Sequence, residues 1–177
     1  TLNINVTDGT KLNAGISQNT KVDSHVKADK IVIKLDSKDA SGTTHAIHQD
    51  KGNLTIDGDV DIDITGQRHT VGVYSHAGST TINGNVKVVL DGNHGGFAEF
   101  GAAGIYAHAG YGGAVGGTVN VNGNVDISGV GNGLFANIGG GTINVNGGKI
   151  NIVDDNIKTG YSAIYSTCGA INMNTVK

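Results

Sequence analysis

The 177-residue sequence has no proline, no tryptophan, one methionine and one cysteine. The single Cys168 excludes an internal disulfide and a cysteine-based zinc site, and its strand-like segment predicts that it is buried. The lack of proline and of a three-residue glycine period excludes a collagen-like chain. The apolar runs are only a few residues long, so none could cross a bilayer as a helix.

Charge and acid–base chemistry are also sparse. Charged residues make up 15% of the chain and its formal net charge is −3, so we expect no nucleic-acid partner and no membrane contact by this segment. Glu99 is the only glutamate, Arg68 is the only arginine, and there is no Gly-x-Ser-x-Gly motif. These absences predict that the chain is not an enzyme, has no catalytic residues and binds no cofactor.

Glycine, asparagine and β-branched residues are abundant instead. The chain has 30 Gly, 19 Asn, 18 Ile and 18 Val, but only 6 Leu. Isoleucine and valine favour strands, whereas glycine and asparagine favour tight turns with positive φ. The composition therefore indicates an all-β protein with many turns.

A motif of one small, one aliphatic and usually one aromatic residue recurs every 26 to 32 residues. Its central residues are Ile16, Ile47, Val73, Ile105, Leu134 and Ile164. A second apolar strand follows, with Ile56, Ile82, Val121, Val145 and Met173 at equivalent positions. In most copies this strand ends in Asp-Gly or Asn-Gly, which predicts a corner, and a third apolar strand comes next. The repeats therefore indicate a solenoid.

Three short strands per repeat, without helices between them, predict strands that stack in parallel on their equivalents one repeat away. We therefore expect an all-β, right-handed, single-stranded parallel β-helix of about six coils. It would form one domain over residues 1–177, with an irregular N-terminal coil or partial cap at 1–35. We expect this to be a fragment of a longer rod that could self-associate through its coil ends or edges. The alternative fold is an antiparallel sandwich or barrel. The repeats disfavour it, because such a fold would not require the same residue order in every repeat.

Two polar clusters could in principle hold a cation. His76 and His108 occupy the same position in successive repeats, with Asp50 and Asn137 at the equivalent positions on either side. Four carboxylates also follow one another at Asp57, Asp59, Asp61 and Asp63. Histidine pairs and clustered carboxylates suit zinc and calcium respectively. We nevertheless expect both clusters to be solvated surface and predict no metal site.

The aromatic position of the repeat is the strongest feature outside the core. The residues are His48, Tyr74, Tyr106, Phe135 and Tyr165, and they should face outward or pack under a loop. The candidate ligand-binding residues are Tyr74, His76, Tyr106, His108, Phe135 and Tyr165. An exposed stripe of this kind would suit sugar rings or a protein partner, whereas a purely structural ladder would only stabilise the coil. Phe97, Phe100 and Tyr111 lie in extended loops and are expected to fold back over a coil.

The stretch Gly104-Ile105-Tyr106-Ala107-His108, followed by Gly-Gly-Thr-Val-Asn-Val-Asn-Gly from Gly116 to Gly123, is similar to passenger repeats of bacterial autotransporter and haemagglutinin-type adhesins. The resemblance extends from about residue 13 to the end and concerns the style of the repeat.

The resemblance implies type V secretion to a Gram-negative cell surface, with anchoring through a C-terminal outer-membrane barrel that is not in this sequence. It also implies a virulence-related role in adhesion to host cells, other bacteria or matrix, through a surface glycan or protein. The alternative is a carbohydrate-active β-helix, such as a polysaccharide lyase or a tailspike-like glycan hydrolase, which would need clustered acids in a groove.

Overall fold

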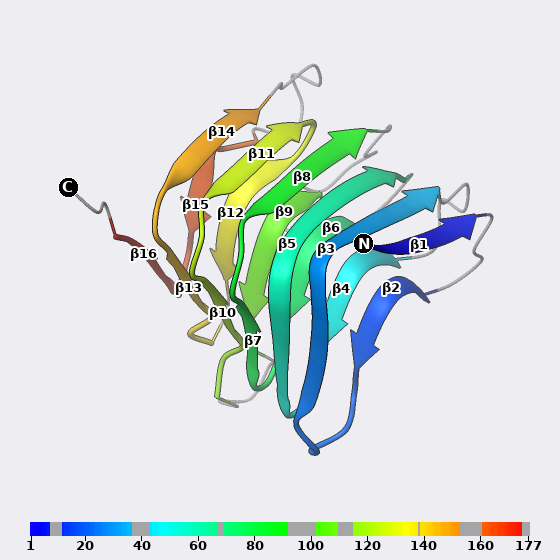
Figure 1. Cartoon of the computed structure of the whole chain (residues 1–177). Coiled ribbons are helices and arrows are strands. Elements are labelled where there is room, and N and C mark those ends of the chain that lie inside the picture. Colours follow the sequence, from blue (N-terminus) through cyan, green and yellow to red (C-terminus); the bar gives the residue numbers. More distant parts are fainter. Residues whose placement is uncertain are drawn as a thin grey trace.

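The computed structural model describes residues 1–7, 12–36, 43–66, 69–91, 102–109, 115–137, 139–152 and 161–174. Within these ranges every regular element is a β-strand, and every pair of neighbouring strands is parallel. Figure 1 shows the strands stacked as successive turns of a solenoid, which confirms the predicted parallel β-helix. Across the same ranges, no helix has the length and apolarity needed to cross a membrane.

Two sheets form the solenoid, and the first has six strands in the order β15-β12-β9-β6-β4-β2. Its members are β2 (Leu12–Gln18), β4 (Thr43–Gln49), β6 (Thr70–Ser75), β9 (Ala103–His108), β12 (Asn132–Asn137) and β15 (Ile164–Ser166). We call it the aromatic sheet because it carries the aromatic position of every repeat.

The second sheet has ten strands. Its members are β1 (Leu2–Thr7), β3 (Ser24–Asp36), β5 (Asn53–Thr65), β7 (Ser79–Ile82), β8 (Val86–Asp91), β10 (Thr118–Val121), β11 (Val125–Gly129), β13 (Thr142–Val145), β14 (Gly148–Ile152) and β16 (Ala170–Met173). It bends into two arms, because β5 pairs with β7 through its first half and with β8 through its second half. We call the row β7-β10-β13-β16 the asparagine arm and the row β8-β11-β14 the charged arm.

Each full turn has three sides, as expected, but the numbers of strands and turns differ from the prediction. From β6 onward a turn uses three short strands, whereas β3 and β5 are single strands of 13 residues that cover two sides. The strands make about five turns rather than six. Counting one coil per motif overestimates the number, because the last repeat supplies only β15 and β16 to the described residues.

The first 35 residues, where an irregular coil or partial cap is expected, contribute strands to both sheets. β1, β2 and most of β3 lie in this range and pair in parallel with other strands. Ile4 and Val6 of β1 alternate with polar residues and pack against the core. Because this alternation has the period of a half-buried strand, β1 adds one more strand beside the second half of β3.

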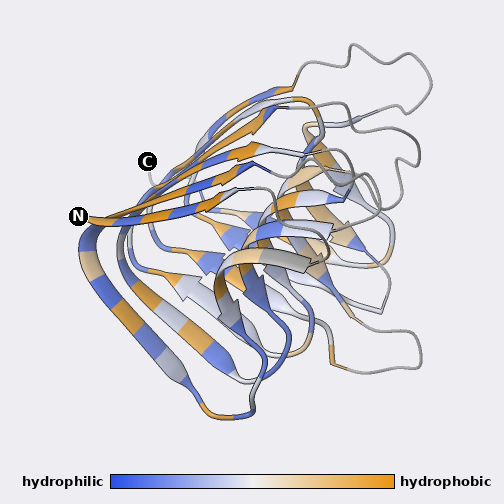
Figure 2. Cartoon of the chain, turned by 90° about the vertical axis from the view of Figure 1, so that its right-hand side faces the viewer, coloured by the Kyte–Doolittle hydropathy of each residue, from blue (hydrophilic) through white to orange (hydrophobic). Residues whose placement is uncertain are grey.

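The core lies between the two sheets and consists of side chains stacked in columns. Strand register confirms both predicted columns, the one centred on Ile105 and the one centred on Ile82. Members in the middle turns are fully buried, whereas Ile164 is 48% and Met173 is 42% exposed. Figure 2 shows the alternation of apolar and polar residues along the strands that directs the Ile and Val side chains inward.

The small residue of the repeated motif also points into this core. Strand pairing skips its position, as where Val71 faces Ala103 and Val73 faces Ile105. A Cβ atom on Gly104 would lie 2.5 Å from Cγ2 of Ile127 in the opposite sheet. The small and the aliphatic residue therefore both face inward, and a local break in alternation makes room for them.

The corner glycines serve two different purposes. Gly58 has a φ of 136°, the positive value that the Asp-Gly sequence predicts. Gly84 and Gly123 have no positive φ; instead, a Cβ on Gly84 would lie 2.3 Å from the carbonyl oxygen of Gly58, and a Cβ on Gly123 2.4 Å from that of Gly84. Glycine is needed at these two corners because successive turns approach closely there.

Candidate functional site

The aromatic position of the repeat forms a continuous column on the outer side of the aromatic sheet. Its members are His48, Tyr74, Tyr106, Phe135 and Tyr165, each paired with the next across a strand boundary. The rings of Tyr106 and Phe135 are stacked, with centroids 4.6 Å apart and an interplanar angle of 10°. The rings of Phe135 and Tyr165 follow at 5.0 Å. The register expected from the repeats is therefore present.

Much of this column is buried, although it lies outside the coil. Phe135 is 0% exposed and Tyr106 is 6% exposed, and with Val71 and Ala103 they form an apolar cluster separate from the main core. Tyr74 and Tyr165 are partly buried at its borders. Water therefore reaches the column at Tyr74 and Tyr165 and not at Phe135.

Histidines gather around Tyr74. The His45 ring stacks on Tyr74 with centroids 4.5 Å apart, and the His48 ring meets Tyr74 edge-on at 5.1 Å. His76 and His108, predicted to be neighbours, are stacked at 5.4 Å. Four imidazoles from three successive turns therefore contact one another or this tyrosine.

Sequence reasoning missed His45 and His69. Strict alternation from the outward His48 would place His45 on the inner face of β4. The break in alternation at Ala46 instead puts His45 and His48 on the same outer side, three residues apart, with 3.1 Å between their Nδ1 atoms. The small residue that recurs before the aliphatic residue of the motif was the available signal. When two adjacent residues both face inward, the residues before them face the opposite way from what strict alternation predicts.

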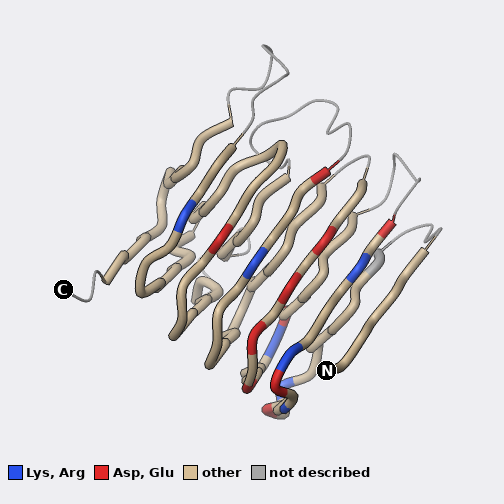
Figure 3. Tube along the Cα trace, turned by 45° about the horizontal axis from the view of Figure 1, so that its top comes forward, with Lys and Arg blue, Asp and Glu red and all other residues tan. Residues whose placement is uncertain are grey.

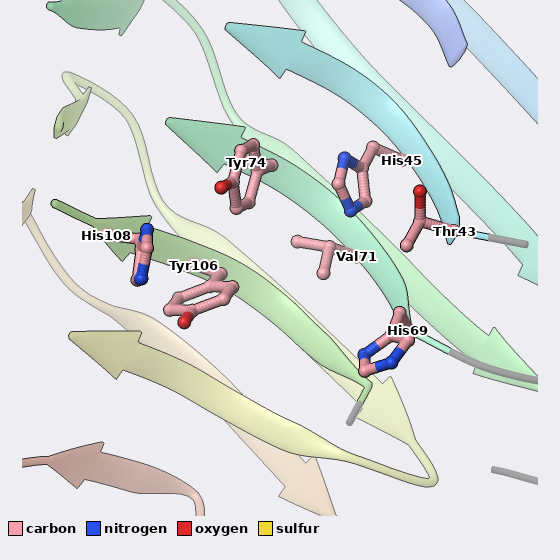
Figure 4. Close-up of a pocket in the computed structure, with 7 residues that line it drawn as sticks. All are labelled: Thr43, His45, His69, Val71, Tyr74, Tyr106 and His108. Atoms are coloured by element: carbon pink, nitrogen blue, oxygen red, sulfur yellow. The ribbon is translucent and has the colours of Figure 1, made fainter. Parts of the chain in front are cut away.

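A hollow of about 220 Å³ opens beside these rings (Figure 4). It is lined by Thr43, His45, His69, Val71, Tyr74, Tyr106 and His108. Figure 4 shows Val71 between the imidazoles of His45 and His69, with Tyr106 and His108 across the hollow on β9. His69 enters β6 with a left-handed φ of 46°, an uncommon conformation for a residue other than glycine.

Burial favours the neutral form of His45, His48 and His108, because it lowers the pKa of each imidazole. It lowers the pKa of His45 from 6.5 to about 3, with smaller effects from His48 and His69. It also lowers the pKa of His108, to which His76 adds. Burial, followed by the charge of Asp50, raises the pKa of Tyr74 to about 12. The described residues that line the hollow include no lysine, arginine or carboxylate, so this part of the lining consists of aromatic rings, a valine and uncharged or weakly basic polar groups.

Several side chains of the two possible cation sites contact protein groups instead. Asp50 accepts a hydrogen bond from Nδ1 of His76 at 2.8 Å, so the acid and the two stacked histidines do converge. Asp61 forms an ion pair with Lys30 at 2.6 Å, and Asp57 contacts His25 at 2.7 Å. Among the residues that the structure describes, no three histidine, cysteine or acidic side chains are arranged to hold a metal ion.

Charges of opposite sign follow one another across the charged arm (Figure 3). Asp61 faces Lys87, Lys87 faces Asp126, and Asp126 faces Lys149 in strand register. A hydrogen bond from Asn83, and then one from His25, lowers the pKa of Asp57. The carboxylates at residues 57–63 therefore belong to a surface of alternating charge, which disfavours calcium.

Two further expectations have different outcomes. Cys168 is exposed, and the prediction that it is buried is wrong. It follows β15, which in the described structure pairs with β12 alone, so only one neighbouring turn packs beside it. Glu99, Arg68 and the loop aromatics Phe97, Phe100 and Tyr111 lie outside the described residues.

Comparisons with family models, with curated proteins and with solved structures give no match to this chain. Its function therefore has to be inferred from its own geometry. That geometry provides a column of rings, a neutral hollow beside it, and an opposite surface of paired polar groups.

Proposed function

We propose that this chain is a segment of a bacterial cell-surface adhesin, in which the solenoid is a rigid stalk whose aromatic sheet binds a glycan or protein on host cells, other bacteria or matrix. The observation that supports this most is the unbroken register of side-chain columns, which continues from β2 to β15 in the aromatic sheet. Columns of this kind stack the turns into a rod, a geometry suited to reaching away from a cell.

Hydrogen bonds between turns support a stiff rod. The Asn83 side chain donates to Asp57 at 2.7 Å, and Asn122 donates to Asn83 at 2.6 Å. A parallel column links Asn144 to Asn120 at 2.8 Å and Asn172 to Asn144 at 2.7 Å. Because each turn contacts only its neighbours, these links add up along the axis and resist bending.

The proposal is tested with beads that carry the folded chain. We expect them to attach to at least one surface from a panel of host cells, bacteria and matrix proteins, and soluble chain to compete. Beads carrying an unrelated β-solenoid of similar length are the control. Equal retention of the two kinds of bead on every surface would contradict adhesion. Antibodies against the folded chain should also label intact source bacteria; labelling only after permeabilisation would contradict a surface location.

One observation favours the carbohydrate-active alternative. His45, His69 and His108 line a hollow that also contains two tyrosines, and imidazoles and phenols can transfer protons. Glycoside hydrolysis, however, ordinarily uses a pair of carboxylates, and the described residues of this lining include none. Incubation of the purified chain with a panel of polysaccharides, followed by assays for new reducing ends and for unsaturated products, distinguishes the two functions. Depolymerisation would replace the adhesin proposal.

A further inference from the structure

We propose that the hollow between β4, β6 and β9 binds one neutral pyranose ring of a glycan. This inference rests on the proposed adhesin function only for the source of the glycan, because the hollow itself is defined by the residues that line it. The ligand is a sugar, and it binds beside His45, His69 and Tyr74 rather than at the buried Phe135 of the predicted stripe.

The size of the hollow favours a single ring. Sites for drug-sized ligands usually enclose about 300–1,000 Å³. The hollow encloses about 220 Å³ and is open on one side, so it has room for one monosaccharide with its neighbours in the glycan outside.

The walls match the two kinds of surface on a sugar. Tyr74 is only partly buried and lines the hollow together with Tyr106, so aromatic carbon is available there for the C–H face of a pyranose to pack against. The His45 ring, itself nearly buried, stacks on Tyr74 with centroids 4.5 Å apart. Thr43, His69 and His108 place hydroxyl and imidazole groups around the same hollow, where sugar hydroxyls would lie.

One buried atom points to a missing hydrogen-bonding partner. Nδ1 of His108 is buried and makes no hydrogen bond. A buried, unpaired polar atom ordinarily destabilises a protein, so such atoms are uncommon. His108 lines the same hollow, so a sugar hydroxyl that reaches this nitrogen would supply the missing partner.

The charge of the described walls favours a neutral sugar. Among the residues that the structure describes around the hollow, none is a lysine or arginine that could pair with the carboxylate of an acidic sugar, and none is an acid that could pair with an amino sugar. A charged sugar would lose hydration on entering the aromatic wall without gaining an ion pair. Neutral hexoses and N-acetylhexosamines avoid this loss.

The test is a titration of the folded chain with neutral methyl pyranosides, followed through the imidazole and tyrosine ring signals in NMR spectra. We expect saturable shifts of His45, His69 and Tyr74 signals for at least one pyranoside, and at least tenfold weaker binding of the matching uronic acid glycoside. His69→Asn should weaken binding at least tenfold, and asparagine tolerates the left-handed φ at this position. Thr43→Phe, which fills the hollow, is a second variant with the same expected result.

His25→Asn is the matched control, because His25 lies on β3, in the other sheet. Thermal unfolding confirms that each variant is folded before binding is compared. The absence of saturable shifts with every neutral pyranoside would overturn the inference, as would equal binding by the two hollow variants and the control. Beads that still adhere while no pyranoside binds would overturn the sugar site alone. Pyranoside binding by a chain whose beads never adhere would overturn the adhesin proposal alone.

Discussion

Side chains point outward from both the aromatic sheet and the asparagine arm, but their exposure to water differs. On the arm, Asn83 and Asn122 are exposed and bond to equivalent side chains in the next turn. On the aromatic sheet, Phe135 and His45 also point away from the coil, yet they are 0% and 7% exposed. An outward direction in a β-solenoid therefore does not imply a solvated side chain.

The contrast has an energetic consequence. Water can replace each hydrogen bond of the asparagine arm, so each contributes little to the free energy of unfolding. Rings removed from water contribute through apolar burial and stacking, which are larger. The aromatic sheet should thus be sensitive to truncation and to acid, whereas the asparagine arm should tolerate substitution.

The largest expected effect comes from Phe135→Ala. Removal of this buried ring should lower the free energy of unfolding by about 3–5 kcal/mol, through lost burial and the cavity that remains. Urea denaturation measures the change. Asn122→Ala, on the asparagine arm, should cost no more than about 1.5 kcal/mol. Equal losses in the two variants would remove the distinction between the faces.

The second prediction concerns Gly104, the small residue of the motif at which the alternation of side chains in the aromatic sheet is broken. Gly104→Val should lower the free energy of unfolding by about 1–3 kcal/mol, because the added carbons overlap with Ile127 and with the carbonyl oxygen of Gly133. Ala46→Gly is the control, since Ala46 takes the same place in the motif and already carries a methyl group. Its cost should be roughly 0.5–1 kcal/mol. A Gly104→Val protein as stable as the parent would show that the position is not tightly packed.

The third prediction is a loss of stability in acid. The pKa of His45 is about 3 in the folded chain and 6.5 in a model peptide, so below pH 6.5 the unfolded chain takes up the proton and the folded chain does not. The stability present above pH 6.5 is lost progressively as the pH falls toward 3. At pH 5 the loss from this group should be about 2 kcal/mol.

Urea denaturation at pH 7 and pH 5 measures that loss. In His45→Phe the difference between the two pH values should shrink, and the remainder comes from His48 and His108, whose pKa values burial also lowers. Asn122→Ala, which changes a non-titrating residue on the other sheet, should leave the pH difference as it is in the parent. A parent protein equally stable at both pH values would contradict a buried, neutral His45.

The smallest expected effect is a gain in stability on the inner side of the asparagine arm. Thr80 is fully buried between Leu54 and Val119, and its hydroxyl makes no hydrogen bond. Thr80→Val should raise the free energy of unfolding by about 1 kcal/mol, because it removes a buried unpaired group. Thr81→Val changes the adjacent outward residue and should give no gain. A destabilised Thr80→Val protein would show that the hydroxyl is satisfied.

Most of the fold could be predicted from the repeated pattern of apolar, small and aromatic residues. The columns through Ile105 and Ile82 follow from residues that recur about thirty positions apart with the same neighbours. The count of turns and the continuous β3 and β5 could not be predicted, because the corner at Asp57-Gly58 bends a strand without ending it. The exposure of Cys168 depends on which turns lie beside it, and no local pattern records that.

Only part of the candidate site could be predicted. The neighbouring His76 and His108 follow from the repeat, and so does the aromatic column. The hollow does not, since His69 lies in a turn and His45 stands where alternation points it inward. In the aromatic sheet, one extra inward residue per strand reverses the side on which the preceding side chains lie.

The amino-acid order by itself determined that the chain stacks in parallel turns, because β-branched residues at regular intervals can all be buried only if equivalent strands lie one above another. Tertiary structure alone decided which outward side chains lose contact with water. Burial depends on what packs over a face, and the buried Phe135, the buried His45 and the hollow between β4, β6 and β9 arise only when separate turns meet.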